Sequence, residues 1–197
     1  MSPKKKGPSP TRPTNGAAHN GRHGRLVRSP ARSREHESES LRLTELVRDD
    51  LVKLPLRATD QWGAVEELIR LMVSRQEVPA SLASAALAAV REREAIRPTG
   101  WKYGLALPNG RVPGLKRVVV AIGVSVPGID FVCRDRLPAR IIVMILLPEA
   151  CYSRFAPGLD TIAETFEDPV FRETVLAARS AAEVVEAVED AESRILA

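Results

Sequence analysis

The fold is decided by one stretch of the chain, Arg140-Ile141-Ile142-Val143-Met144-Ile145-Leu146-Leu147. Successive side chains of a strand point to opposite faces of a sheet, so an apolar side chain at every position requires that both faces be covered. We therefore expect a central strand with helices on both of its sides. The run ends at Pro148 and is far shorter than the roughly 20 apolar residues that cross a bilayer, so we expect no membrane insertion.

Three further stretches are expected to join this strand in a sheet. Residues 118–126 are rich in β-branched side chains and should form a long strand that ends at Pro127-Gly128. Residues 104–108 form a short apolar run that a turn closes, and residues 51–56 read as a short edge strand. Residues 129–133 fit another short strand or a turn.

Helices are expected on either side of these strands in the sequence. Apolar residues recur at three- and four-residue steps after a cap at Thr59 or Asp60, and a second helix with Pro79 in its first turn should end near residues 91–94. Three more helices are expected, near residues 158–166, after Asp168-Pro169 and after Ser180. The pattern predicts an α/β fold, a three-layer α/β/α domain with a mixed central sheet and helices on both faces.

Charge and composition divide the chain in two. Residues 1–40 hold nine Lys and Arg against three Glu, a net charge of about +6, and almost no large apolar side chain. The remaining residues hold 20 basic and 22 acidic side chains. We expect a disordered basic tail over 1–40 and a folded domain over 41–197, because the tail cannot bury enough surface to offset its ordering entropy.

The chain has two cysteines, Cys133 and Cys151, which form neither a disulfide framework nor a metal-binding pair. The basic N-terminus is not followed by the apolar segment of a secretory signal. We therefore expect a cytoplasmic protein whose cysteines are small core residues, with no metal and no cofactor.

The chemically informative residues lie in Arg93-Glu94-Ala95-Ile96-Arg97-Pro98-Thr99 and in Gly104-Leu105-Ala106-Leu107-Pro108-Asn109-Gly110. This pair of segments resembles the signature of the type 2 enzyme IIA domains, the fructose/mannitol and nitrogen-regulatory type, of the bacterial phosphoenolpyruvate-dependent sugar phosphotransferase system. The resemblance continues in family order through the later strands and helices, over roughly residues 41–190.

In that family a histidine accepts phosphate from a phosphocarrier protein, and the resemblance places Asn109 at its position. A carboxamide nitrogen shares its lone pair with the carbonyl group, so Asn109 lacks the nucleophile that imidazole provides. A second family histidine is also missing, because Phe155 and Pro157 stand where it would be expected. The three histidines of the chain, His19, His23 and His36, all lie in the tail. By motif match, the pocket would consist of Arg93, Thr99, Pro108, Asn109, Gly110 and Arg111.

The resemblance implies a regulatory domain that binds protein partners of the phosphotransferase or regulatory type without carrying phosphate, and it leaves a homo-oligomer open. One alternative is a working phosphocarrier with another nucleophile, for which Cys151 is the candidate. Another is that the basic tail binds nucleic acid or an acidic partner surface, with a strong salt dependence that deletion of residues 1–40 removes. The tail is otherwise explained as a solvating segment or as sequence upstream of the true start codon.

Overall fold

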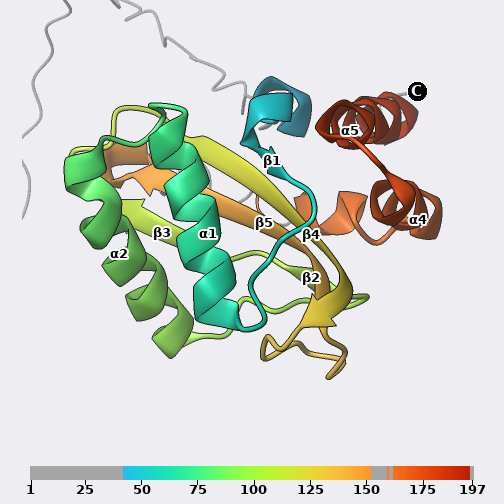
Figure 1. Ribbon diagram of the computed structural model, residues 1–197, viewed down its shortest axis with the longest axis horizontal. Helices are drawn as coiled ribbons and strands as arrows, with labels where there is room; N and C mark the ends of the chain where they lie inside the picture. The colour runs from blue at the N-terminus through green and yellow to red at the C-terminus, as the bar shows by residue number, and fades with distance from the viewer. Residues whose placement is uncertain (1–41, 152–158, 160–161, 196–197) are drawn as a thin grey trace, which may run out of the picture. The chain divides into compact units, whose positions relative to one another are not determined.

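A computed structural model describes residues 42–151, 159 and 162–195, and its centre is a five-stranded mixed sheet (Figure 1). The tail expected at residues 1–40 lies outside the described residues. The strands are β1 (Val52–Lys53), β2 (Leu105–Ala106), β3 (Asn109–Val112), β4 (Val119–Ile129) and β5 (Ala139–Pro148).

The apolar stretch at residues 140–147 forms β5, the strand on which most of the sheet is built. It pairs with β4 in antiparallel fashion on one side and with β2 and β3 in parallel on the other, and β1 adds to β4 in parallel. β2 and β3 hold the same register against β5, so they are two parts of one edge strand that is interrupted at Leu107 and Pro108. A proline cannot donate to the ladder, which is why the strand breaks there.

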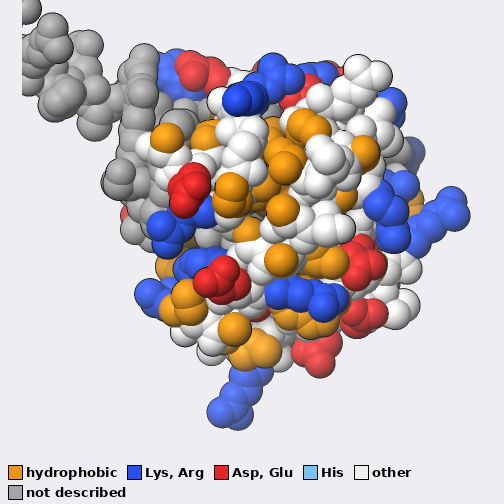
Figure 2. Space-filling model, turned by 90° about the vertical axis from the view of Figure 1, so that its left-hand side faces the viewer, with side chains coloured by type: hydrophobic (Ala, Val, Ile, Leu, Met, Phe, Trp, Pro, Cys, Tyr) orange, Lys and Arg blue, Asp and Glu red, His pale blue; other side chains and the backbone are white. Residues whose placement is uncertain are grey.

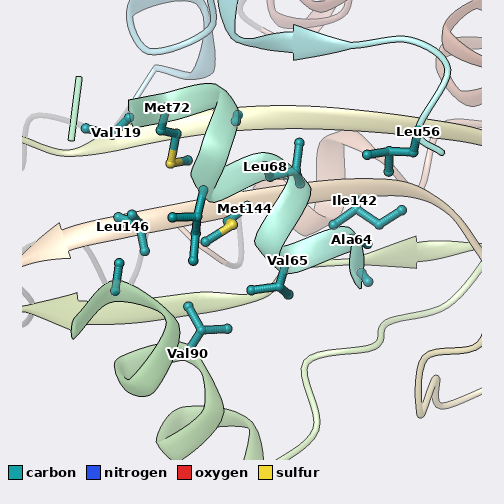
Figure 3. Close-up of a cluster of buried hydrophobic side chains, with 14 of the residues drawn as sticks. Leu56, Ala64, Val65, Leu68, Met72, Val90, Val119, Ile142, Met144 and Leu146 are labelled. Atoms are coloured by element: carbon teal, nitrogen blue, oxygen red, sulfur yellow. The ribbon is translucent and has the colours of Figure 1, made fainter. Parts of the chain in front are cut away.

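Two helical layers cover the sheet. Helices α1 (Gln61–Ser74) and α2 (Ala83–Ile96) lie on one face, where they contact the alternate β5 residues Ile142, Met144 and Leu146 (Figure 3). On the other face, α4 (Pro169–Ala177) and α5 (Ala181–Ile195) cover the intervening β5 residues, together with the short 3-10 helix Leu43–Glu45. The next 3-10 helix, Asp49–Leu51, contributes Leu51 to the core under α1 and α2. The three-layer α/β/α fold with a mixed sheet is therefore confirmed.

The helix starts follow the expected capping chemistry. Asp60 accepts hydrogen bonds from the backbone N–H groups of Trp62 and Gly63 at the start of α1. Asp168 accepts from Val170 N, and the proline that follows it opens α4. The Ser180 hydroxyl accepts from Glu183 N at the start of α5. Pro79 precedes a 3-10 turn, Ala80–Leu82, and α2 itself begins only at Ala83.

Two expectations about the strands need correction. The strand predicted to end at Pro127-Gly128 continues through them to Ile129, because a bulge with a register shift between Val124 and Ile129 absorbs the irregular residues. Gly128 adopts a left-handed backbone there, with φ +84°. The edge strand expected over residues 51–56 is reduced to two residues, β1.

Of the helix expected near residues 158–166, Leu159 and residues 162–165 are described and helical, and residues 158, 160 and 161 lie outside the described residues. Among the described residues, no helix is both long enough and apolar enough to cross a membrane.

Replacing Leu68 with alanine should lower the free energy of unfolding by about 3 kcal/mol, because this α1 side chain is completely buried against the sheet. Urea denaturation of the two proteins measures the difference. Val170→Ala is the matched control, since Val170 is 59% exposed on α4 and should change stability by less than about 0.5 kcal/mol. Equal losses in both variants would contradict the packing described.

Candidate functional site

A pocket of about 500 Å³ lies between α2 and the edge strand β3. The α2 side contributes three alanines and three larger side chains. The space-filling view of this side of the domain shows hydrophobic groups gathered at its centre with charged groups around them (Figure 2). The residues that line the pocket are Ala85, Ala88, Ala89, Glu92, Arg93, Ile96, Asn109, Gly110, Arg111, Pro113 and Glu149.

Gly110 allows β3 to lie directly against α2. A Cβ atom at this position would come within 2.9 Å of the Val90 backbone nitrogen and 3.1 Å of the Ala89 Cβ. Since those atoms belong to the helix backbone and to a short side chain, any larger residue would push α2 away from the sheet. The absence of a side chain at Gly110 therefore sets the width of the pocket.

Asn109 lines the pocket and is almost fully buried, with 3% of its surface exposed. Its Nδ2 donates a hydrogen bond of 2.9 Å to the carbonyl oxygen of Leu107, whereas its Oδ1 has no hydrogen-bond partner. Rotating the amide by half a turn would place Oδ1 against the Leu107 carbonyl oxygen, and two acceptors repel. The amide is therefore fixed in one orientation.

A buried carboxylate organises the chain that leads to Asn109. Glu94, on the last turn of α2, is 8% exposed and accepts hydrogen bonds from Thr99 N (3.1 Å), from the Thr99 hydroxyl (2.6 Å) and from Gln61 Nε2 (2.8 Å). Hydrogen bonds to a carboxylate are among the stronger ones in proteins, so this Glu94–Thr99 clamp ties the end of α2 to the segment before β2.

The clamp is connected to Asn109 by a continuous series of hydrogen bonds. The Thr99 carbonyl oxygen accepts from Leu107 N at 3.0 Å, and the Leu107 carbonyl oxygen accepts from Asn109 Nδ2. Asn109 is thus held through Leu107 and Thr99 by the carboxylate of Glu94. Glu94 of the Arg-Glu pair and Thr99 therefore contribute to the site by positioning the side chain of Asn109.

Charges of both signs line the pocket. Arg93 and Arg111 are the cations, and Glu92 and Glu149 are the carboxylates. The Arg93 guanidinium donates from Nη1 to the carbonyl oxygen of Arg97 at 2.8 Å, which satisfies one of the last carbonyl groups of α2 and holds the side chain near its helix end.

The structure brings together four of the six residues expected at the site, Arg93, Asn109, Gly110 and Arg111. Thr99 lies in the clamp, where its hydroxyl donates to Glu94 instead of reaching the pocket. Pro108 contributes its carbonyl oxygen to the sheet, where it accepts from Ile145 N at 2.9 Å. Sequence reasoning assigned no role to Glu94 or Glu149. The only available signal for Glu94 was its place in the Arg-Glu pair.

A charge run such as Arg91-Glu92-Arg93-Glu94 is typical of a solvated helix end with paired charges. Arg91 fits this pattern, because it is exposed and pairs with Glu66 of α1 at 3.6 Å. Glu94 does not fit, because it is buried in the clamp.

Of the two cysteines, Cys133 is buried in the core beneath α1 and α2, as expected, and does not line the pocket. Burial raises the pKa of the Cys133 thiol to about 11, with smaller contributions from the carboxylates of Asp135, Asp130 and Glu94. A thiol that stays protonated at neutral pH is a poor nucleophile. The side chain of Cys151 and the segment with Phe155 and Pro157 lie outside the described residues.

Within the described part of the chain, no group of three His, Cys, Asp or Glu side chains could hold a metal ion. The pocket thus offers hydrogen-bonding groups and opposite charges. The lone pair of Asn109 Nδ2 is delocalised into the carbonyl group, so this nitrogen is a poor nucleophile at neutral pH.

Residues 45–191 match the family described as phosphoenolpyruvate-dependent sugar phosphotransferase system, EIIA 2. The chain belongs to this family. A fructose-specific EIIA component of Haloferax volcanii is 31% identical over 131 residues, which cover 66% of this chain and 84% of that protein. A nitrogen regulatory protein of Bradyrhizobium diazoefficiens is 24% identical over 139 residues, covering 71% and 89%.

Solved structures share the fold of this EIIA type 2 domain. The nitrogen regulatory protein IIA-Ntr of Neisseria meningitidis has a TM-score of 0.66 at 23% identity, and the match covers 74% of this chain and 97% of that one. The mannitol IIA of Escherichia coli has a TM-score of 0.59 at 19% identity, with 72% and 98% covered. The expected family and fold are therefore confirmed.

The Glu94 clamp makes a prediction for the stability of this EIIA type 2 domain. Glu94→Ala should cost about 3 kcal/mol in the free energy of unfolding, because Thr99 and Gln61 lose the acceptor of their hydrogen bonds. Urea denaturation checks this, with Glu92→Ala as the control, since Glu92 lies two positions earlier on α2 and is exposed. A Glu94→Ala protein as stable as the control would show that the clamp contributes nothing.

The burial and raised pKa of Cys133 predict the reactivity of its thiol and the pH dependence of stability. In a Cys151→Ala variant, the remaining thiol should react slowly with iodoacetamide at pH 8 in the native protein and quickly in denaturant, because its raised pKa and its burial keep the thiolate population low. Since the native state holds this proton more tightly than the unfolded state, the stability contributed by the neutral thiol is present below pH 9 and is lost as the pH rises towards 11. Equal rates in native and denatured protein would contradict this assignment.

Proposed function

We propose that this EIIA type 2 domain does not carry phosphate and acts by binding protein partners at the Asn109 pocket. The observation that carries the proposal is the state of Asn109, which is buried, fixed by the Leu107 carbonyl oxygen and without a nucleophilic atom. Groups that could surround a phosphate-accepting residue are present around Asn109: the clamp, the close approach at Gly110 and the two arginines.

The chemistry of the Asn109 side chain supports the proposal that the domain does not accept a phosphoryl group. Phosphoryl transfer to a protein nitrogen needs a lone pair that attacks phosphorus while the bond to the donor breaks. Delocalisation into the carbonyl group occupies the lone pair of Asn109 Nδ2, and its hydrogen is donated to Leu107. Cys133, the cysteine whose side chain the structure describes, is buried, does not line the pocket and is protonated at neutral pH because burial raises its pKa to about 11.

A protein partner is supported by the surface beside the pocket and by one relative. The pocket wall on α2 combines three alanines with Glu92, Arg93 and Ile96. Ile96 is 76% exposed, and an exposed apolar side chain next to charged groups suits a transient protein interface. The E. coli mannitol enzyme IIA has been solved in complex with phosphorylated enzyme IIB. We propose a partner of the phosphotransferase or regulatory type for this chain.

Exchanging Asn109 for histidine tests the proposal. The full chain should remain unlabelled after incubation with radioactive phosphoenolpyruvate and the two upstream phosphotransfer proteins. Asn109→His should become labelled, because its Nδ1–H can donate to the Leu107 carbonyl oxygen in place of the amide and leave Nε2 available for attack. Asn109→Ala is the control and should stay unlabelled.

Stable label on the wild-type domain would overturn the proposal, and Cys151→Ala would then show whether that cysteine carries it. An unlabelled Asn109→His protein would show that the retained pocket does not support transfer even with its nucleophile restored.

A further inference from the structure

A second exposed surface lies on the loops at residues 100–104 and 131–138, where β2 begins and where β4 is joined to β5 (bottom of Figure 1). None of its residues lines the Asn109 pocket. We propose that this surface binds an acidic protein segment that carries aliphatic side chains. The Trp101 surface, as we call it, comprises Trp101, Lys102, Tyr103, Val132, Arg134, Arg136, Leu137 and Arg172.

Two arginines lie against aromatic rings in this surface. The guanidinium carbon of Arg134 is 3.6 Å from the centroid of the Trp101 ring, and that of Arg172 is 4.5 Å from the Tyr103 ring. Such contacts stabilise a cation at the ring face. They also hold the planar guanidinium in place while its edge N–H groups remain able to form paired hydrogen bonds with a carboxylate.

Further hydrogen bonds fix the parts of this arrangement. Trp101 Nε1 donates to Glu167 at 3.2 Å, and Arg172 Nη1 donates to the Phe166 carbonyl oxygen at 2.7 Å. Because these groups are already ordered, binding would cost less side-chain entropy than binding by flexible side chains.

The backbone of the two loops is held together at Asp135. Its carboxylate accepts from Tyr103 N at 2.5 Å and from Leu137 N at 3.1 Å, so it joins one loop to the other. Tyr103 and Arg136 have left-handed backbones, with φ of 61° and 63°. Bulky residues adopt this conformation at a cost that surrounding contacts must offset, and such residues occur often at binding sites.

The charges of the Trp101 surface are unbalanced. In the part of the chain that the structure describes, the side chains of Lys102 and Arg136 form neither an ion pair nor a hydrogen bond, and Arg134 forms a cation–π contact with Trp101. With Arg172, these four cations outnumber the neighbouring carboxylates Asp130, Asp135 and Glu167. The surface therefore has a net positive charge, although residues 41–197 as a whole are slightly acidic.

Apolar side chains lie among these cations. Val132 is 66% exposed, Leu137 52% and Tyr103 48%. Tryptophan, tyrosine and arginine are the residue types that most often dominate the binding energy of protein–protein interfaces. Here they surround exposed aliphatic side chains. Single-stranded nucleic acid instead needs free aromatic faces for base stacking, and arginines already occupy a face of both rings. The composition favours an acidic protein segment with aliphatic anchors.

The experiment measures fluorescence anisotropy of a labelled peptide of alternating Glu and Leu, with the full-length protein at low salt. We expect saturable binding that weakens about tenfold in Arg134→Ala and in Arg136→Ala, as for residues near the centre of an interface. A peptide with Gln in place of Glu should not bind. Arg70→Ala is the control, since Arg70 is an exposed arginine of α1 and should leave the affinity unchanged.

Unchanged affinity in Arg134→Ala and Arg136→Ala would overturn the proposal, because the peptide would then be held elsewhere, the basic tail included. Equal weakening in Arg70→Ala would show that only overall charge matters, which also overturns it. An oligothymidylate that binds more tightly than the peptide, and loses affinity in Arg134→Ala, would assign the surface to nucleic acid instead. Circular dichroism of each variant ensures that lost affinity reflects the surface and not unfolding.

Discussion

The buried carboxylate of Glu94 is the interaction on which the geometry of the site depends. It stands at the end of α2 and accepts both hydrogens that Thr99 can donate, along with one from Gln61 at the start of α1. A carboxylate removed from water is costly unless its oxygen atoms are hydrogen-bonded, so the two helices and the segment before β2 are held in one arrangement. Two further hydrogen bonds, from Leu107 N to the Thr99 carbonyl oxygen and from Asn109 Nδ2 to the Leu107 carbonyl oxygen, connect Thr99 to the amide of Asn109.

Under the proposed function, this arrangement would allow the site to keep its geometry without a phosphate-accepting histidine. The positioning of residue 109 depends on backbone groups, on a carboxylate and on the missing side chain of Gly110, and none of these depends on a histidine. Asn109 donates to a carbonyl oxygen that an imidazole N–H could also use, so under the proposed function an asparagine can stand in place of a histidine without a change in the surrounding hydrogen bonds. The pocket with its two arginines is then available for recognition.

Much of this was predictable from the sequence, because the relevant signals are local. The uninterrupted apolar run of β5 predicts cover on both faces, and Asp60 and Asp168 mark helix starts by their capping chemistry. The motif around Asn109 indicated a site, and four of its six residues line one pocket. The tail and its function stay a prediction.

The features that sequence reasoning missed depend on contacts between distant residues. Alternating charges at a helix end usually indicate exposure, so Glu94 could not be distinguished until its contact with Gln61, 33 residues away, was known. The continuation of β4 through Pro127-Gly128 depends on its pairing with β5 beyond the bulge. Likewise, Gly110 is needed because β3 lies close to α2, and the local sequence does not predict that two such elements will be neighbours.

The claim that Asn109 occupies a preserved framework can be tested by the tautomer of a histidine placed there. Long-range nitrogen–proton NMR of an Asn109→His protein labelled with nitrogen-15 reports which ring nitrogen carries the proton. The account predicts that Nδ1 is protonated, because it donates to the Leu107 carbonyl oxygen, and that Nε2 is unprotonated in the neutral ring. A neutral ring protonated on Nε2 would contradict it.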